Sequence, residues 1–127
     1  MRIVIAGAGN VGIHLAKLLS GENQDIILID ESEEKLSRLD SSFDLLTIQE
    51  SPITLHGLKE AGAGDADLFV AVTTDESRNL ISAQLAHYLG AKKTVARINN
   101  YVSEVYTRSL VYSGGRPFIF TSQPNLS

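Results

Sequence analysis

Residues 2–12 read Arg-Ile-Val-Ile-Ala-Gly-Ala-Gly-Asn-Val-Gly, an apolar run that breaks into three glycines with the spacing G-x-G-x-x-G. The pattern predicts a strand, a tight turn and the start of a helix. Gly7 permits the turn, Gly9 lets a pyrophosphate approach the backbone, and Gly12 lets the helix lie close to the strand. Free N–H groups and the helix dipole favour negative charge at such a helix N-terminus. The predicted phosphate site comprises Gly7, Gly9, Asn10, Val11 and Gly12.

A carboxylate follows the glycines at the distance that a dinucleotide site requires. Asp30 ends the apolar run 25–29, about 20 residues downstream of the glycines. An acid there accepts hydrogen bonds from the adenosine ribose hydroxyls and repels a 2′-phosphate. The alternative is a structural turn without a ligand, with Asp30 as a surface acid at a strand end. The glycine spacing and the acid together favour a nucleotide site.

Composition restricts the class of protein. The 127 residues suffice for one core, so residues 1–127 are predicted to form a single domain. The net charge of −4 argues against nucleic acid as a partner. Cysteine is absent and the three histidines lack paired spacing, so no metal site is expected. With no signal-peptide pattern and no apolar run approaching the ~20 residues that span a bilayer, we expect a cytoplasmic protein.

Strand-like and helix-like patterns alternate along the chain. Further strands are expected at 25–29, 43–48, 68–72 and 94–98. Ser51-Pro52 has the form of an N-cap followed by proline, which predicts a helix from there to Gly62. Alternation with short connections predicts an α/β protein of the Rossmann type, with a doubly wound parallel sheet in a three-layer α/β/α arrangement.

The apolar stripes of the helices predict which sides face the sheet. The expected stripes are Val11, Leu15, Leu18 and Leu19 in the first helix, Leu36 and Leu39 in the second, and Leu80, Ile81, Leu85, Tyr88 and Leu89 in the last. Beyond residue 100 the pattern is weaker: Val102, Tyr106 and Leu110 could line a helix, Gly114-Gly115 a turn, and 118–120 a strand. The three histidines are expected to be solvated.

Several further motifs follow the glycines in a fixed order. They are Ile29-Asp30, Leu58-x-x-Ala61-Gly62-Ala63-x-x-Ala66-Asp67, Ala71-Val72-Thr73 with Asn79 six residues on, and Ala96-Arg97-Ile98. With these motifs, residues 1 to 100 resemble the nucleotide-binding domain of Trk-type potassium-uptake regulators, the TrkA-like proteins also called RCK or KTN domains. The resemblance implies a cytosolic regulatory subunit that is not an enzyme. Such a subunit binds NAD(H) or ATP/ADP, forms homo-oligomers, and lies at the inner membrane face under a potassium transporter subunit.

The resemblance also implies roles for individual residues. The glycines would contact the pyrophosphate and Asp30 the ribose, with Glu31 beside it. Thr73 and Thr74 would contact the nucleotide at the end of the fourth strand, and Arg97 would face phosphate or a neighbouring subunit. Many members carry Gly-Asp near the adenine, where this chain has Glu50-Ser51, so Ser51 is included as a contact that differs from the family pattern.

Other interpretations remain open for these residues and for the whole chain. Thr73 and Thr74 could cap a helix that begins near Asp75, Arg97 could form a salt bridge at the rim, and Glu31 could be a solvated first-turn acid. The alternative function is an NAD-dependent oxidoreductase or its cofactor domain, and a third is a Rossmann scaffold for protein contacts. The family often continues into a further domain, so the chain is a candidate fragment of a longer regulator.

Overall fold

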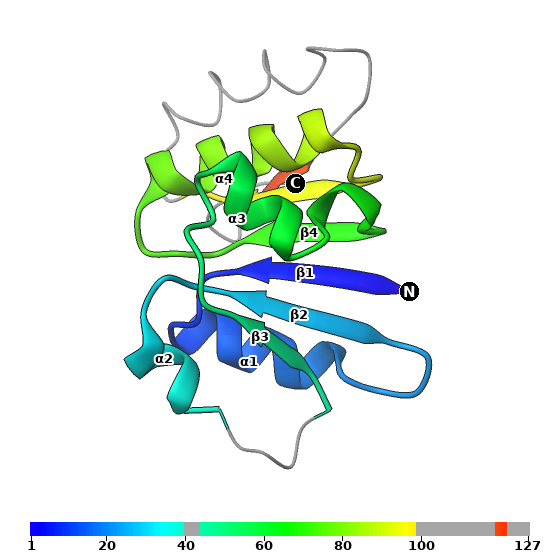
Figure 1. Cartoon of the computed structure of the whole chain (residues 1–127), viewed down its shortest axis with the longest axis vertical. Helices are drawn as coiled ribbons and strands as arrows, with labels where there is room; N and C mark the ends of the chain where they lie inside the picture. Colours follow the sequence, from blue (N-terminus) through cyan, green and yellow to red (C-terminus); the bar gives the residue numbers. More distant parts are fainter. Residues whose placement is uncertain (40–43, 99–118, 122–127) are drawn as a thin grey trace.

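The computed structural model describes residues 1–39, 44–98 and 119–121, and its centre is a parallel sheet. Six strands pair in the order β3-β2-β1-β4-β5-β6, and every pair is parallel (Figure 1). They are β1 (Arg2–Ala6), β2 (Asp25–Ile29), β3 (Leu46–Ile48), β4 (Leu68–Ala71), β5 (Thr94–Arg97) and β6 (Ile119–Thr121). The order runs outward in both directions from β1, which confirms the doubly wound Rossmann-type sheet.

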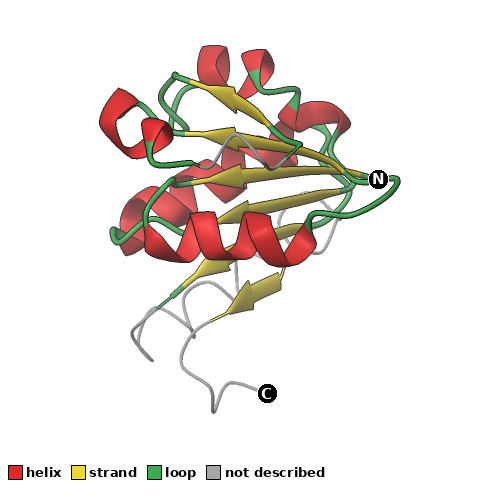
Figure 2. Ribbon diagram, turned by 90° about the horizontal axis from the view of Figure 1, so that it is seen from below, coloured by secondary structure: helices red, strands yellow, loops and turns green. Residues whose placement is uncertain are grey.

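Helices cover both faces of this sheet (Figure 2). They are α1 (Asn10–Leu19), α2 (Glu33–Ser37), α3 (Leu55–Glu60), the 3-10 helix η1 (Ala63–Asp65) and α4 (Glu76–Leu89). Successive residues of β1 feed the two cores: Ile3 and Ile5 pack on the α1 side, and Val4 and Ala6 on the side of α3 and α4. The three-layer α/β/α prediction is therefore confirmed. Among the described residues, no helix combines the length and the apolar character that crossing a membrane requires.

Small residues, not the largest apolar ones, bring α1 onto the sheet. Gly12 and Ala16 are the buried residues of this helix, whereas Val11 is 42% exposed and Leu18 is 67% exposed. The predicted stripe was therefore wrong for Val11 and Leu18, while Leu15 and Leu19 do pack against the core. Close approach of a helix to a sheet selects small side chains at the contact, and a stripe drawn by hydrophobic size misses them.

The same effect changes the buried face of α4. Ala83 and Ala86 are fully buried, and His87 is only 6% exposed, while Tyr88 is 74% exposed. Ile81, also predicted in the stripe, is 47% exposed. The prediction that all histidines are solvated was thus wrong for His87, which lies beside the alanines that contact the sheet.

The helix predicted from Ser51 begins later. Thr54 is the N-cap of α3, and its side-chain oxygen accepts a hydrogen bond from the Gly57 N–H at 3.0 Å. Ser51 instead forms part of the preceding turn: its hydroxyl accepts from the Ile53 N–H at 3.3 Å. Serine and threonine can both cap a helix. Thr54 is the cap because its oxygen lies within hydrogen-bond reach of a free N–H in the first turn, while the Ser51 oxygen is used in the turn before it.

Two predicted strands are shorter or shifted. β3 covers only Leu46–Ile48 of the predicted 43–48, and β6 is found at Ile119–Thr121 rather than 118–120. The expected helix with Val102, Tyr106 and Leu110, the turn at 114–115 and the end at 122–127 lie outside the described residues, as do positions 43 and 118.

Asp67 links Arg2 to Lys92 at the amino ends of the strands, and these contacts predict a pH dependence of the stability. Its carboxylate accepts from the Arg2 backbone N–H at 2.8 Å and from the Lys92 ammonium at 2.9 Å. These two contacts, the backbone hydrogen bond first, lower the pKa of Asp67. Because the pKa of Asp67 is lower in the folded than in the unfolded chain, its ionised form stabilises the folded protein at pH values above the unfolded pKa of about 4. This stabilisation is lost as the pH falls through the lowered pKa of the folded state.

We therefore expect Asp67→Asn to lower the melting temperature at neutral pH, and the difference from the parent chain to shrink below about pH 4. Thermal unfolding of both proteins between pH 3 and pH 7 measures the difference in melting temperature. Asp65→Asn is the control, because Asp65 is 87% exposed and meets Arg2 only at 3.9 Å. A difference in melting temperature that stays the same at every pH would contradict a stabilising role of the ionised Asp67 carboxylate.

Candidate functional site

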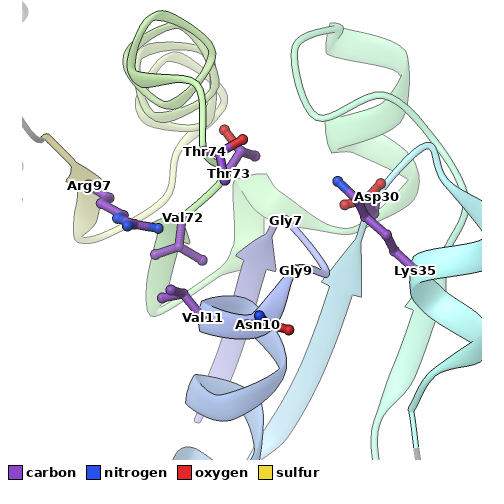
Figure 3. Close-up of a pocket in the computed structure, with 10 residues that line it drawn as sticks. All are labelled: Gly7, Gly9, Asn10, Val11, Asp30, Lys35, Val72, Thr73, Thr74 and Arg97. Atoms are coloured by element: carbon purple, nitrogen blue, oxygen red, sulfur yellow. The ribbon is translucent and has the colours of Figure 1, made fainter.

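A cavity of about 260 Å³ opens at the carboxyl ends of the central strands, where the strand order reverses direction. This is the position at which open α/β sheets bind ligands. Figure 3 shows the residues around it, which come from the strand ends and from the helices α1 and α2. The lining residues are Gly7, Gly9, Asn10, Val11, Asp30, Lys35, Val72, Thr73, Thr74 and Arg97. The structure therefore brings most of the predicted site residues together around one cavity.

A second hollow of about 170 Å³ adjoins the first and shares Asp30, Lys35, Thr73 and Thr74 with it. Its remaining lining residues are Glu31, Ser32, Pro52, Asp75 and Arg78. Two predicted residues, Gly12 and Ser51, line neither space. Gly12 packs beneath the turn, and Ser51 is used in the turn before α3. The loop after β3 reaches the hollow through Pro52 instead.

Two of the three glycines are required by the fold itself. Gly7 has φ +115°, and a Cβ there would lie 3.1 Å from the Thr73 nitrogen. A Cβ on Gly12 would lie 1.7 Å from the Gly7 carbonyl oxygen. Both positions exclude a side chain, the first through backbone conformation and the second through contact between α1 and the turn. Their predicted roles in turn formation and close packing agree with this geometry.

Gly9 differs from its two neighbours. Its φ of −77° suits any residue, and a Cβ there would meet nothing within 4 Å. It is the N-cap of α1, a helix whose first turn has no side-chain cap and no acidic residue. A serine or aspartate would stabilise the helix better at this position. Glycine here leaves open space above the helix N-terminus.

Asp30 connects the glycine turn to the loop after β2. One carboxylate oxygen accepts from the Ala8 N–H at 2.8 Å, and the other accepts from the Ser32 N–H at 2.8 Å. The residue is 8% exposed. Each carboxylate oxygen has more than one acceptor position, so two backbone bonds leave capacity for ligand hydroxyls. Asp30 therefore shapes the turn and still borders both spaces.

A buried amide joins the ends of β4 and β5. Asn79, which is 1% exposed, donates from its side-chain nitrogen to the carbonyls of Thr73 at 3.0 Å and Arg97 at 3.1 Å. Its side-chain oxygen accepts from the Thr73 N–H at 2.9 Å and from the Thr73 hydroxyl at 2.6 Å. Thr73 is therefore held by Asn79. The cap of α4 is Asp75, which accepts from the Arg78 N–H at 3.2 Å, so neither threonine is the N-cap.

The charges around the cavity are unevenly paired. Glu31 forms an ion pair with Arg78, which joins the loop after β2 to the start of α4. The Arg97 guanidinium and the Lys35 ammonium have no ion-pair partner among residues 1–39, 44–98 and 119–121. The rim salt bridge considered for Arg97 is thus not formed within the described part of the chain. Two cations that form no ion pair within the described part of the chain therefore border the cavity, together with the Asp30 carboxylate.

Six residues that line the two spaces were not predicted as site residues: Ser32, Lys35, Pro52, Val72, Asp75 and Arg78. Lys35 lies five residues after Asp30, and nothing in its neighbourhood separates it from an ordinary solvated lysine. The Glu31–Arg78 pair joins residues far apart in the sequence, so only the folded chain shows it. Asn79 was part of a recognised motif, but its bonds to two strand ends follow from burial.

Comparison with known proteins places the chain in a family. Residues 3–112 match the TrkA-N domain. The chain is 43% identical over 101 residues to the Trk system potassium uptake protein TrkA of Haemophilus influenzae, a match that covers 79% of this chain and 22% of that protein. The chain thus spans about a fifth of the length of that relative.

Two solved structures have a fold similar to that of this chain. The AMP-bound form of the Kef CTD from Shewanella denitrificans has a TM-score of 0.73 at 27% identity, covering 97% of this chain and 72% of that one. The GsuK RCK domain has a TM-score of 0.71 at 26% identity, covering 95% of this chain and 25% of that one. The resemblance drawn from the motifs is thereby confirmed, and the chain belongs to the TrkA-N domain family.

Proposed function

We propose that this chain is the nucleotide-binding domain of a regulator that controls a membrane potassium transporter of the Trk type. The observation that carries the proposal is Gly9, the one glycine of the turn that the fold does not require. Its open space lies above the uncapped N-terminus of α1, inside the cavity. Backbone N–H groups at such a helix end bind phosphate, and only glycine lets the phosphate come close.

The ligand class follows from the residues around that phosphate position. Asp30 provides an acceptor for ribose hydroxyls on one side of the turn. On the other side Thr74 and Arg97 provide donors, and Thr73 borders the cavity with its N–H and hydroxyl already donated to Asn79. These groups suit an adenine nucleotide such as NAD(H) or ATP/ADP. The similar Kef domain was solved with AMP. Val11 and Asn10, in the first turn of α1, complete the proposed phosphate contacts, and Glu31 borders the ribose side.

The proposed regulatory role is supported by the family to which the chain belongs. The relatives are named for potassium uptake, so the proposed partner is a membrane transporter subunit, which would keep this domain at the cytoplasmic face. A nucleotide controls such a partner only if it binds two conformations or assemblies with different affinity. A homo-oligomer of these domains would provide the two states.

The competing function is NAD-dependent oxidation or reduction. Hydride transfer needs a group that moves a proton beside the substrate. The described lining of the two spaces offers Lys35, three carboxylates and hydroxyl groups for that task, but no histidine or tyrosine. Incubation with NADH and candidate carbonyl substrates separates the two functions. Steady loss of NADH absorbance that depends on substrate would favour the enzyme.

Gly9→Ala tests the nucleotide site directly. Because the added Cβ meets no protein atom within 4 Å, the free energy of unfolding is expected to change by less than about 0.5 kcal/mol. The same methyl group occupies the space that phosphate needs, so affinity for NADH and ADP is expected to fall at least about tenfold. Calorimetric titration and urea unfolding of the same samples measure both quantities.

Gly21→Ala is the matched control, since a Cβ at Gly21 also meets nothing within 4 Å and Gly21 lies at the other end of α1. It should bind nucleotide like the parent chain. Unchanged affinity in Gly9→Ala would mean that no phosphate lies over the turn, and the proposal would fail.

A further inference from the structure

Lys35 is a cation at the cavity that has no ion-pair partner in the described part of the chain. It lies in α2, its backbone N–H is bonded to the Ser32 hydroxyl at 3.2 Å, and its side chain borders both hollows. In Figure 3 this side chain extends from α2 past Asp30, with its nitrogen in the gap between Asp30 and the two threonines. A lysine at the surface normally extends into water or pairs with a neighbouring acid.

Of the acids close to Lys35 in the sequence, Glu33 is two helix positions away, a spacing at which side chains do not face each other, and the others have partners. Glu34 pairs with Arg38 at 3.1 Å, and Glu31 pairs with Arg78. Both oxygens of Asp30 accept backbone N–H groups at 2.8 Å. The Lys35 ammonium therefore remains available at the cavity, next to a carboxylate whose negative charge is already shared with two donors.

The position of the gap tells which part of a nucleotide Lys35 would meet. β1 lies between β2 and β4 in the sheet, so the gap between Asp30, at the end of β2, and Thr73, just beyond β4, lies over the glycine turn that follows β1. That is the path of the phosphates if Asp30 holds the ribose. Arg97, at the end of β5, approaches the same cavity from the opposite side (Figure 3).

We propose that Lys35 binds the phosphate nearest the ribose, and that Arg97 binds the next phosphate along the chain. The inference rests on the proposed function, because it assumes that the cavity takes an adenine nucleotide with its ribose on Asp30. The two cations would select nucleotides with at least two phosphates, such as ADP, ATP or NADH, over AMP.

The test measures the affinities of adenosine, AMP and ADP by calorimetry for three variants. Lys35→Gln is expected to weaken AMP and ADP by about tenfold each, the size of one charge-assisted hydrogen bond, and to leave adenosine unchanged. Arg97→Gln is expected to weaken ADP by about tenfold and to change AMP by less than about twofold. Lys35→Arg keeps the charge and should restore most of the AMP affinity.

Lys59→Gln is the matched control. Lys59 lies in the last turn of α3, is exposed, and borders neither hollow, so its loss changes the net charge equally without touching the site. Nucleotide affinity should stay within about twofold of the parent chain.

The remaining outcomes overturn the inference in distinguishable ways. If Lys35→Gln weakens adenosine as much as AMP, the residue positions α2 and does not bind phosphate. If Lys35→Gln leaves AMP unchanged, or if Arg97→Gln is the variant that weakens AMP, the assigned order of phosphates is wrong. If the parent chain binds none of the three ligands, the proposed function fails together with this inference.

Discussion

Replacing Gly12 with alanine is expected to lower the free energy of unfolding by about 3 kcal/mol and to abolish nucleotide binding. The added Cβ would lie 1.7 Å from the Gly7 carbonyl oxygen and 2.8 Å from its carbonyl carbon. These are backbone atoms in the turn, so no flexible side chain can yield. Helix α1 must move away from the turn, which opens the core around Ala16 and displaces the N-terminus that would hold the phosphate.

Urea unfolding measures this change, and the variants at positions 9 and 12 are informative as a pair. Both add one methyl group to the same turn, yet Gly9→Ala should affect binding alone and Gly12→Ala should affect folding first. Gly21→Ala again controls for the loss of a glycine near α1. If Gly12→Ala is as stable as the parent chain, the turn can accommodate a Cβ at position 12, and the expected clash with the Gly7 carbonyl is wrong.

Asn79→Asp is expected to cost about 3 kcal/mol at neutral pH. The change keeps the shape of the side chain but replaces the nitrogen that donates to the Thr73 and Arg97 carbonyls with a second oxygen. At 1% exposure, an ionised carboxylate facing two carbonyl oxygens loses its hydration and gains repulsion. Because these effects raise the pKa of the introduced acid, the loss should grow as the pH rises above about 4.

Thermal or urea unfolding at several pH values measures the loss, with Ser77→Ala as the control, since Ser77 is exposed in the same helix. Nucleotide affinity should also fall at pH values where the variant is still folded, because Thr73 and Arg97 lose the group that fixes their positions. A variant as stable as the parent chain at every pH would contradict the role assigned to Asn79.

The sequence alone determined the order of the elements and the location of the site. Period-two and period-3.6 patterns are local, so residues 2–6 and 25–29 indicate strands wherever the rest of the chain lies. Asp30 and the glycine turn are fixed by their separation along one βαβ unit, which has little freedom of geometry. For that reason Gly7, Gly9 and Asp30 could be placed at one edge of the sheet in advance. Thr73 and Arg97 were placed there by the family resemblance and by their positions at the ends of two further predicted strands.

Only the tertiary structure decided which side chains that edge would use. The buried faces of α1 and α4 depend on how closely each helix approaches the sheet, and small residues such as Ala16 and Ala86 determine that distance. The choice of Thr54 over Ser51 as a cap depended on which oxygen met the free N–H groups. The approach of Lys35 to the cavity depended on Glu31 and Glu34 having other partners. The partner of Glu31 is distant in the sequence, and such a pair leaves no periodic trace there.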